Sequence, residues 1–270
     1  MSDIPPPAGR HIISVANQKG GVGKTTTAIN LGTALSAVGR KTLIIDLDPQ
    51  GNASTGLGIS PKSRELTTYD LLSGDVGLAE IIHPTSIPAL FVAPSTVDMS
   101  SADIDLVNDP RRVLRLRDAL DRPGARECGF DYILIDCPPS LSLLTVNALV
   151  ASTSVLVPLQ CEFFALEGLS QLMLSIREVR QTLNPQLRIQ GIVLTMFDKR
   201  NNLSFQVAQD VRENLGDLVY ETTIPRNVRL SEAPSHAIPA LIYDHRSSGS
   251  VAYQKLAAEL LRRVRDSVAA

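Results

Sequence analysis

The chain alternates short runs of β-branched and other apolar residues with longer segments whose apolar positions recur at helical spacing. The short runs predict strands and the longer segments predict helices. This alternation is typical of an α/β fold with a mostly parallel sheet and helices on both faces. The strands are expected at residues 11–17, 42–47, 90–93, 131–136, 153–159, 189–196 and 219–224, and the helices near 25–38, 110–121, 141–151, 165–183, 203–215 and 250–267.

The length of the chain indicates how many domains to expect. A length of 270 residues suits one α/β domain, expected over residues 10–270, because such folds commonly reach this size as single units. Residues 1–9 are rich in proline and are expected to form a disordered tail. Residues 52–88 are rich in Gly, Ser and Pro, which indicates short helices and loops over the top of the sheet.

Composition narrows the class of protein further. The formal net charge is −2 and 20% of the residues are charged, so the chain as a whole is no obvious polyanion binder. The sequence begins with no basic and apolar secretory signal, and no apolar run reaches membrane-spanning length, so a cytoplasmic protein is expected. The odd number of cysteines and the lack of CxxC spacing predict reduced thiols at Cys128, Cys137 and Cys161.

A glycine-rich segment lies between the first expected strand and the first expected helix. Glycine backbone N–H groups there can wrap an anion, Lys24 adds a point charge, and the Thr25 hydroxyl can reach Mg²⁺. The strict pattern G-x-x-x-x-G-K-[ST] fails, because Gln18 stands where its first glycine belongs and Lys19 adds a second cation. The sequence predicts a P-loop fold of about seven to eight strands, with a phosphate site at Lys19, Gly20, Gly21, Val22, Gly23, Lys24, Thr25 and Thr26.

Carboxylates follow two other expected strands. Asp136 ends the apolar run at 132–136 and suits a Walker B role of holding Mg²⁺, directly or through water. Asp46 and Asp48 are alternate residues, which in an extended strand point to the same side and would repel without a cation or polarised water between them. Spacing alone leaves open which of Asp46 and Asp48 does which work.

Five motifs together resemble the ParA/Soj family of partition ATPases, and the resemblance runs from about residue 10 to the C-terminus. The first motif alone marks the deviant Walker A class, which also includes MinD, the nitrogenase iron protein and arsenite ATPases. The last two narrow the resemblance to ParA/Soj of the chromosomal type. The motifs are KGGVGKTT (19–26), DLDPQGN (46–52), DCPP (136–139), QCEFFALEG (160–168) and PRNVRLSEAPS (225–235).

The resemblance implies an ATP-driven switch. Two ATP-bound subunits would face each other, with Lys19 reaching the partner's phosphates, so that ATP shifts the association equilibrium and hydrolysis reverses the shift. By resemblance, Asp48 orients the attacking water, and Asp46 and Asp136 belong to the Mg²⁺ shell with Thr25. Catalytic roles fall to Lys19, Lys24 and Asp48. The resemblance places the base against Pro225, Arg226, Asn227 and Met196, and the ribose near Glu162 and Phe163.

DNA binding is expected from charge distribution rather than from total charge. Residues 1–198 carry 16 basic and 20 acidic side chains, and residues 199–270 carry 10 and 8. Arginines in expected loops, presented twice by a two-fold dimer, would give sequence-independent phosphate contacts. Arg200 and Arg229, with Arg246, are the candidates, although ordinary ion-paired surface arginines are the alternative.

The resemblance also implies a partner, a ParB/Spo0J-type centromere-binding protein whose basic N-terminal segment stimulates hydrolysis, and a nucleoid-associated location. The short tail leaves no room for a DNA-reading module. Three other classes compete. A MinD-like membrane cycler would use an amphipathic C-terminal helix, although the stripe of Leu256, Leu260, Val264 and Val268 is expected to pack on the core. An electron-transfer protein would need cluster-ligating cysteines, and a small-molecule kinase would need an acceptor pocket and lid.

Overall fold

The computed structural model describes residues 9–163 and 165–269. The expected tail at 1–9 therefore lies, except for Gly9, outside the described residues. The strands are β1 (His11–Val15), β2 (Thr42–Asp46), β3 (His83–Pro84), β4 (Leu90–Ala93), β5 (Tyr132–Asp136), β6 (Ser154–Gln160) and β7 (Arg188–Thr195). The helices are α1 (Lys24–Ala37), α2 (Asn52–Gly56), α3 (Thr68–Ser73), α4 (Leu78–Ile81), α5 (Ala102–Asp105), α6 (Arg115–Asp121), α7 (Pro123–Glu127), α8 (Leu143–Ala151), α9 (Ala165–Thr182), α10 (Asn202–Leu215), α11 (Val228–Glu232), α12 (Ala240–Tyr243) and α13 (Ser248–Ala269).

A seven-stranded sheet forms the centre of the molecule, in the order β3-β4-β2-β5-β1-β6-β7. All neighbouring strands pair in parallel except β3, which pairs antiparallel with β4. The α/β fold with a mostly parallel sheet is thereby confirmed. Since the carboxyl ends of parallel strands lie at one edge, the loops after β1, β2, β5, β6 and β7 converge there.

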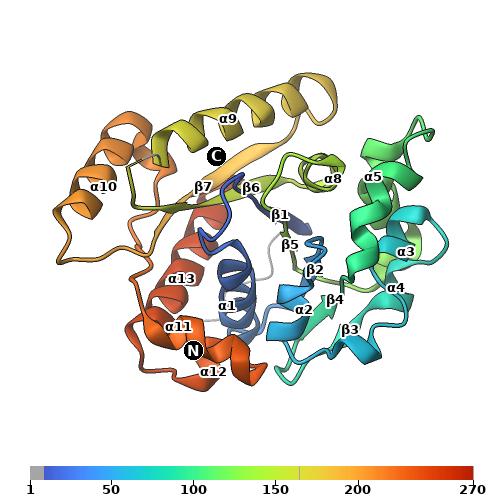
Figure 1. Cartoon of the computed structure of the whole chain (residues 1–270), viewed down its shortest axis with the longest axis horizontal. Coiled ribbons are helices and arrows are strands. Elements are labelled where there is room, and N and C mark those ends of the chain that lie inside the picture. Colours follow the sequence, from blue (N-terminus) through green and yellow to red (C-terminus); the bar gives the residue numbers. More distant parts are fainter. Residues whose placement is uncertain (1–8, 164, 270) are drawn as a thin grey trace.

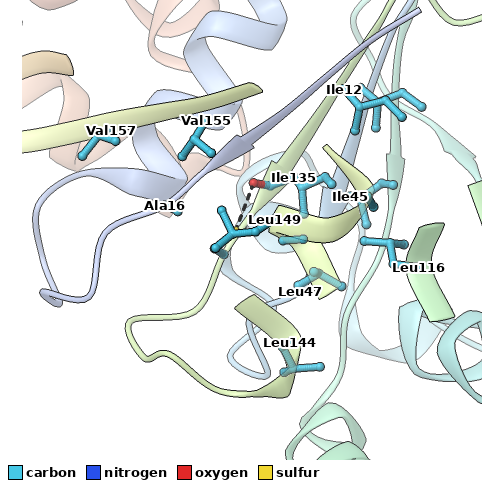
Figure 2. Packing of buried hydrophobic residues seen from close by; sticks show 14 of the residues in the cluster. Ile12, Ala16, Ile45, Leu47, Leu116, Ile135, Leu144, Leu149, Val155 and Val157 are labelled. Atoms are coloured by element: carbon cyan, nitrogen blue, oxygen red, sulfur yellow. Dashed lines mark hydrogen bonds between the residues drawn. The ribbon is translucent and has the colours of Figure 1, made fainter. Parts of the chain in front are cut away.

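Each face of the sheet has its own apolar core, because successive strand residues point to opposite faces. Ile13 and Ile44 face the side covered by α1 and α13, whereas Ile12 and Ile45 face the side covered by α6, α8 and α9. Figure 2 shows this second core, where Ile45 and Ile135 from the strands lie with Leu116 and Leu149 from the helices. Helices therefore cover both faces, as the apolar pattern predicts (Figure 1).

Most expected elements agree with the structure, and residues 52–88 do hold short helices, but the strand expected at 219–224 is wrong. The segment runs beside β7. Tyr220 N–H and Ile224 N–H donate backbone hydrogen bonds of 2.8 Å to the carbonyls of Ile192 and Leu194. Between them, Glu221 N–H and Thr222 N–H donate instead to the Glu259 carboxylate, at 2.9 and 3.0 Å. The α13 carboxylate thus takes the hydrogen bonds that would have made a regular ladder. Sequence alone could not locate that acceptor.

The C-terminal stripe packs on the domain, as expected. On α13, three residues of the stripe are buried in the core that α1 and α13 cover, namely Leu256, Leu260 and Val264. The side chain of Val268 lies outside the described residues. No helix in the described part of the chain is both long and apolar enough to cross a membrane.

Glu259 should contribute pH-dependent stability. Burial favours a raised pKa, but the N–H groups of Thr222 and Glu221 and the Arg263 guanidinium outweigh burial, and the pKa of Glu259 lies below its ordinary 4.5. A depressed folded-state pKa stabilises above the unfolded pKa, and this stability is lost as pH falls through the folded value. We expect Glu259→Gln to lower the free energy of unfolding by about 1–3 kcal/mol at pH 7.

Urea unfolding of both proteins between pH 7 and pH 3 measures this difference. The gap between wild type and Glu259→Gln should close as pH falls below about 4.5. A gap that stays constant over the whole range would mean that the carboxylate charge is not what holds residues 221 and 222.

Candidate nucleotide site

The loop after β1 is pinned to β6 and β7, the two strands that lie in succession on one side of β1. Asn17 donates from Nδ2 to the Pro158 carbonyl of β6 at 2.7 Å and accepts from Lys19 N–H at 3.0 Å. From β7, the strand beyond β6, the Thr195 hydroxyl donates to the Val22 carbonyl at 2.9 Å. The shape of the loop is therefore set by tertiary contacts as well as by its own sequence.

The loop forms a cradle of open backbone donors. Gly21 and Gly23 have φ of 76° and 88°, a left-handed conformation that strongly favours glycine, and Gly23 is the N-cap of α1. The N–H groups of residues 20–23 have no acceptor among the described residues. Free N–H groups at the start of a 14-residue helix make an anion site.

Two lysines lie at this cradle in different states. Lys24 is buried, and its Nζ donates to the Lys19 carbonyl at 3.0 Å. Burial lowers the pKa of Lys24, while the neighbouring carboxylates of Asp136 and Asp48 partly oppose that shift. Lys19 is about half exposed and forms an ion pair with Glu162, in the loop after β6. Lys24 therefore serves the loop of its own chain, and Lys19 points out to the loop's rim.

Two carboxylates lie side by side below the cradle. Asp46 and Asp136 are register partners at the ends of β2 and β5, and both are fully buried. Burial, and for Asp136 also the neighbouring Asp46 charge, raises the pKa of each well above its ordinary value. Two buried like charges of this kind are stable only with a compensating cation or shared proton.

The two carboxylates differ in their partners. Asp46 accepts from Ser54 N–H and Oγ at 2.9 and 2.6 Å and from Asp48 N–H at 3.2 Å. Neither oxygen of Asp136 has a hydrogen-bond partner of normal geometry among the described residues, although the Thr25 hydroxyl is near enough to lower its pKa in part. No three His, Cys, Asp or Glu side chains of the described chain are grouped to hold a metal ion. Asp136 is thus the carboxylate with free coordinating capacity.

Asp48 lies in a turn rather than in the strand. β2 ends at Asp46, and Asp48 N–H donates to Asp46 Oδ1 at 3.2 Å, so Asp48 lies past the regular strand and its same-side placement with Asp46 stays a prediction. Asp48 is partly exposed, and its Oδ1 accepts from Gln50 N–H at 3.0 Å. Through Oδ1, the Asp48 carboxylate therefore helps to hold the turn.

Arg64 braces this turn from behind and is a residue that sequence reasoning missed. Its buried guanidinium donates to the Ser95 carbonyl at 2.9 Å, the Thr55 hydroxyl at 2.7 Å and the Ile59 carbonyl at 2.7 Å. A Cβ on Gly51 would lie 2.2 Å from Arg64 Nη1, and Gly51 has a φ of 61°. The close approach explains the glycine, but no local motif marks Arg64 or Asn17.

The residues expected around the base come together only in part. Met196 (φ 50°) follows β7, and the next residue, Phe197, exchanges backbone hydrogen bonds with Ile224 and Arg226. Met196, Pro225, Arg226 and Glu162 thus share the edge beside the loop. The Phe163 side chain is exposed. Asn227 caps α11 and donates to Ser248 at 2.8 Å.

The arginines expected to bind DNA are exposed, but two are paired within the chain. Arg200 bonds Asp198 at 2.9 Å, and Arg229 bonds Glu232 at 2.8 Å and lies 3.5 Å from Asp244. Arg246 is exposed, and its backbone N–H donates to Asp244. Arg229 and Arg246 thus share one neighbourhood, and Arg200 lies before α10.

The three cysteines are free: Cys137 and Cys161 are buried, and Cys128 is partly exposed. The expectation of unbridged thiols is confirmed for the described chain. The electron-transfer alternative gains no cysteine cluster from the described residues.

Comparison with known proteins agrees with the geometry of the site. A family model described as an AAA domain matches residues 10–189. The chromosome partitioning protein ParA of Caulobacter vibrioides is 58% identical over 255 residues, covering 94% of this chain and 95% of that protein. The sporulation initiation inhibitor protein Soj of Bacillus subtilis is 51% identical over 249 residues, covering 92% and 97%.

A solved structure adds a liganded relative. The cobyrinic acid a,c-diamide synthase of Mycobacterium smegmatis, with bound ATP analogue and magnesium, superposes with a TM-score of 0.83 at 36% identity, covering 96% of this chain and 97% of that one. Fold and site therefore define a P-loop nucleotide-binding protein. Within that class, the chain belongs to the ParA/Soj family of chromosome-partitioning proteins.

Replacing Arg64 should loosen the turn that carries Asp48. Arg64→Met leaves the Ser95 and Ile59 carbonyls without their donor, which should lower the free energy of unfolding by about 1–3 kcal/mol. Amide hydrogen exchange across residues 48–56 should accelerate, because that segment loses its buried brace. Arg126→Met is the matched control, since Arg126 makes only an exposed ion pair with Asp121. Unchanged exchange at 48–56 in Arg64→Met would contradict the bracing role.

Proposed function

We propose that this chain is an ATP-dependent switch for chromosome or plasmid partition. ATP and Mg²⁺ bind at the loop after β1, two ATP-bound subunits associate face to face, the dimer binds DNA without sequence preference, and hydrolysis releases it. The observation that carries the proposal is the set of open loop N–H groups beside buried Lys24 and the unpartnered carboxylate of Asp136. The partition names of close relatives support the biological role.

The residues present suit Mg²⁺ with a nucleotide. Mg²⁺ usually binds one or two carboxylates together with substrate phosphates and water. Asp136 has two uncommitted buried oxygens, and Thr25 offers a hydroxyl on the first turn of α1. Bound Mg²⁺ would neutralise phosphate charge. Both oxygens of Asp46 are already engaged, so we infer that Asp46 belongs to the Mg²⁺ environment by orienting Ser54 and the Asp48 turn.

Three groups then share the work of hydrolysis. Lys24 binds the phosphates of its own chain, and Lys19, held by Glu162 in the single chain, is released to the phosphates of the facing subunit. Asp48, next to the site and still partly open, orients the attacking water. Phosphoryl transfer needs positioning and charge neutralisation more than covalent chemistry, so these groups suffice for an ATPase.

The nucleoside is assigned to the neighbouring edge. We place the base against Met196, Pro225, Arg226 and the backbone at Asn227, because the loop after β7 meets the segment 224–226 there. Glu162 and Phe163 follow β6 on the same edge and are assigned to the ribose side.

DNA binding is assigned to Arg200, Arg229 and Arg246. In the single chain, carboxylates already neutralise the first two. Exposed pairs of this kind are weak, about 0–1 kcal/mol, so a phosphate can displace the carboxylate. A dimer presents each arginine twice, which makes the binding salt-sensitive and independent of sequence.

The partner that follows from the family is a ParB/Spo0J-type protein that stimulates hydrolysis, and the site of action is the nucleoid. The alternative is a MinD-like positioning ATPase that cycles on a membrane. The packing of Leu256, Leu260 and Val264 into the core argues against the C-terminal helix as an anchor.

The two lysines should separate nucleotide binding from dimerisation. Lys24→Ala removes the buried cation and should weaken ATP binding about 10- to 100-fold. Lys19→Ala should bind ATP within about twofold of wild type but fail in ATP-dependent dimerisation and hydrolysis, because its ammonium acts on the partner's phosphates. Fluorescent-nucleotide titration and light scattering measure the two properties. Lys255→Ala, at an exposed α13 position, is the control. Equal loss of ATP affinity in both loop variants would reject the cross-subunit role.

Replacing the arginines should weaken DNA binding but leave dimerisation intact. Arg200→Glu and Arg229→Glu should each weaken duplex retention across all sequences and reduce the salt slope by about two per dimer, since each removes one phosphate contact per subunit. ATP-dependent dimerisation should persist in light scattering. Arg180→Glu, on the exposed side of α9, should leave retention unchanged. Dimers of the variants that retain DNA with the wild-type slope would refute these contacts.

A further inference from the structure

The acidic residues of this chain are concentrated in one segment. Residues 65–110 contain no Lys or Arg and eight acidic residues. Because the whole chain has a formal net charge of −2, the residues outside this segment carry a net charge of +6. The acids are Glu65, Asp70, Asp75, Glu80, Asp98, Asp103, Asp105 and Asp109.

The fold keeps this charge at one end of the molecule. The segment contains α3, α4, β3, β4 and α5, which lie at the right of Figure 1. Of the elements near the arginines assigned to DNA, α10 lies at the left of Figure 1, and α11 and α12 lie at the bottom, near the middle. The acids of this segment therefore lie at the end of the molecule opposite α10, with the arginines of α6 and α7 as their basic neighbours.

Most of this acidic charge is left without an ion pair. None of the acids between residues 65 and 105 forms an ion pair with a described residue, and Asp109 is paired with Arg115. Asp70 and Glu80 cap helices through the N–H groups of Thr67 and Gly77. Asp98, Asp103 and Asp105 are exposed, so their charge is available to a partner.

Apolar side chains stand exposed among these carboxylates. In the segment 97–107, Met99, Ala102 and Leu106 are buried against the core. Between them, Val97 is 71%, Ile104 73% and Val107 53% exposed. The Tyr69 hydroxyl of α3 donates to Asp105 at 2.7 Å, which ties α5 to the body of the domain. This is a fixed surface with an apolar stripe and an acidic border, the two components of a protein docking site.

We propose that this acidic face, formed by Val97, Ile104, Val107, Asp98, Asp103 and Asp105, docks a basic segment of another protein that also carries aliphatic side chains. Its cations pair with the three carboxylates, and its aliphatic side chains cover the stripe. Opposite charge favours such a segment and raises its association rate.

The same charge disfavours the other occupants. DNA phosphates are repelled by a face with three unpaired carboxylates. A second copy of this chain meeting it through a two-fold contact would bring like charges together. The acidic face lies on other elements than the arginines assigned to DNA, so a basic protein segment and DNA need not compete for one surface.

The identity of the partner rests on the proposed function, under which the cognate ParB-type protein is the first probe. The full chain is titrated with that purified protein in the presence of ATP, and fluorescence anisotropy is recorded. Asp98→Asn/Asp103→Asn/Asp105→Asn keeps the hydrogen-bond acceptors and should weaken binding about tenfold, from three exposed ion pairs of modest strength. Val97→Ser/Ile104→Ser should weaken it about five- to tenfold.

Matched controls have the same chemistry elsewhere. Glu167→Gln/Glu178→Gln/Asp210→Asn removes three exposed acids from α9 and α10, and Leu174→Ser removes an exposed aliphatic side chain from α9. Both should bind the partner within about twofold of wild type. ATP-dependent DNA retention, measured on the same samples, should be unchanged in all four variants.

Three results would each overturn the docking face. The face variants could bind the partner with wild-type affinity, the α9 and α10 controls could lose as much affinity as the face variants, or the wild-type chain could fail to bind the partner. None of these results touches the switch, which stands if DNA retention still requires ATP. Conversely, partner binding with nucleotide-independent DNA retention would support the face and refute the switch.

Discussion

The placement of two buried carboxylates beside one another is the constraint on which the site depends. Asp46 and Asp136 end adjacent buried strands in register, and burial raises the pKa of both. Two carboxylates buried in a hydrophobic sheet are stable only with a compensating cation or a shared proton. Lys24 supplies one positive charge from the start of α1, and the proposed Mg²⁺ supplies the other. Nucleotide binding and local stability at this edge are thus two aspects of one electrostatic requirement.

Division of labour between the two carboxylates follows from their neighbours. Ser54 and the Asp48 backbone hold Asp46, so Asp46 connects the end of β2 to the turn that carries Asp48. Arg64 closes the far side of that turn on Thr55 and Ser95. The residue proposed to orient the water therefore lies in a turn that buried hydrogen bonds hold in place.

Much of the fold and of the candidate nucleotide site could be predicted from the local pattern of residues in the sequence. The loop at 19–26 and the carboxylates at 46 and 136 were identifiable because glycines, lysines and aspartates follow apolar strands directly. The roles of Asn17, Arg64 and Glu259 could not be predicted. Each side chain hydrogen-bonds to backbone groups that are distant along the chain or that no motif marks. The same limit explains the error at 219–224, where an α13 carboxylate replaces strand pairing. The match of whole motifs to ParA/Soj gave the family, but the partners of individual side chains required the fold.

In the proposed switch, ATP controls both association and DNA binding, and one side-by-side measurement tests that claim. Sedimentation and duplex retention would be recorded on the same protein with Mg²⁺ and ATP, a slowly hydrolysed analogue, ADP, or no nucleotide. The account predicts dimers and DNA binding together with ATP and the analogue, and neither with ADP or without nucleotide. DNA retention of equal strength in all four conditions would contradict it.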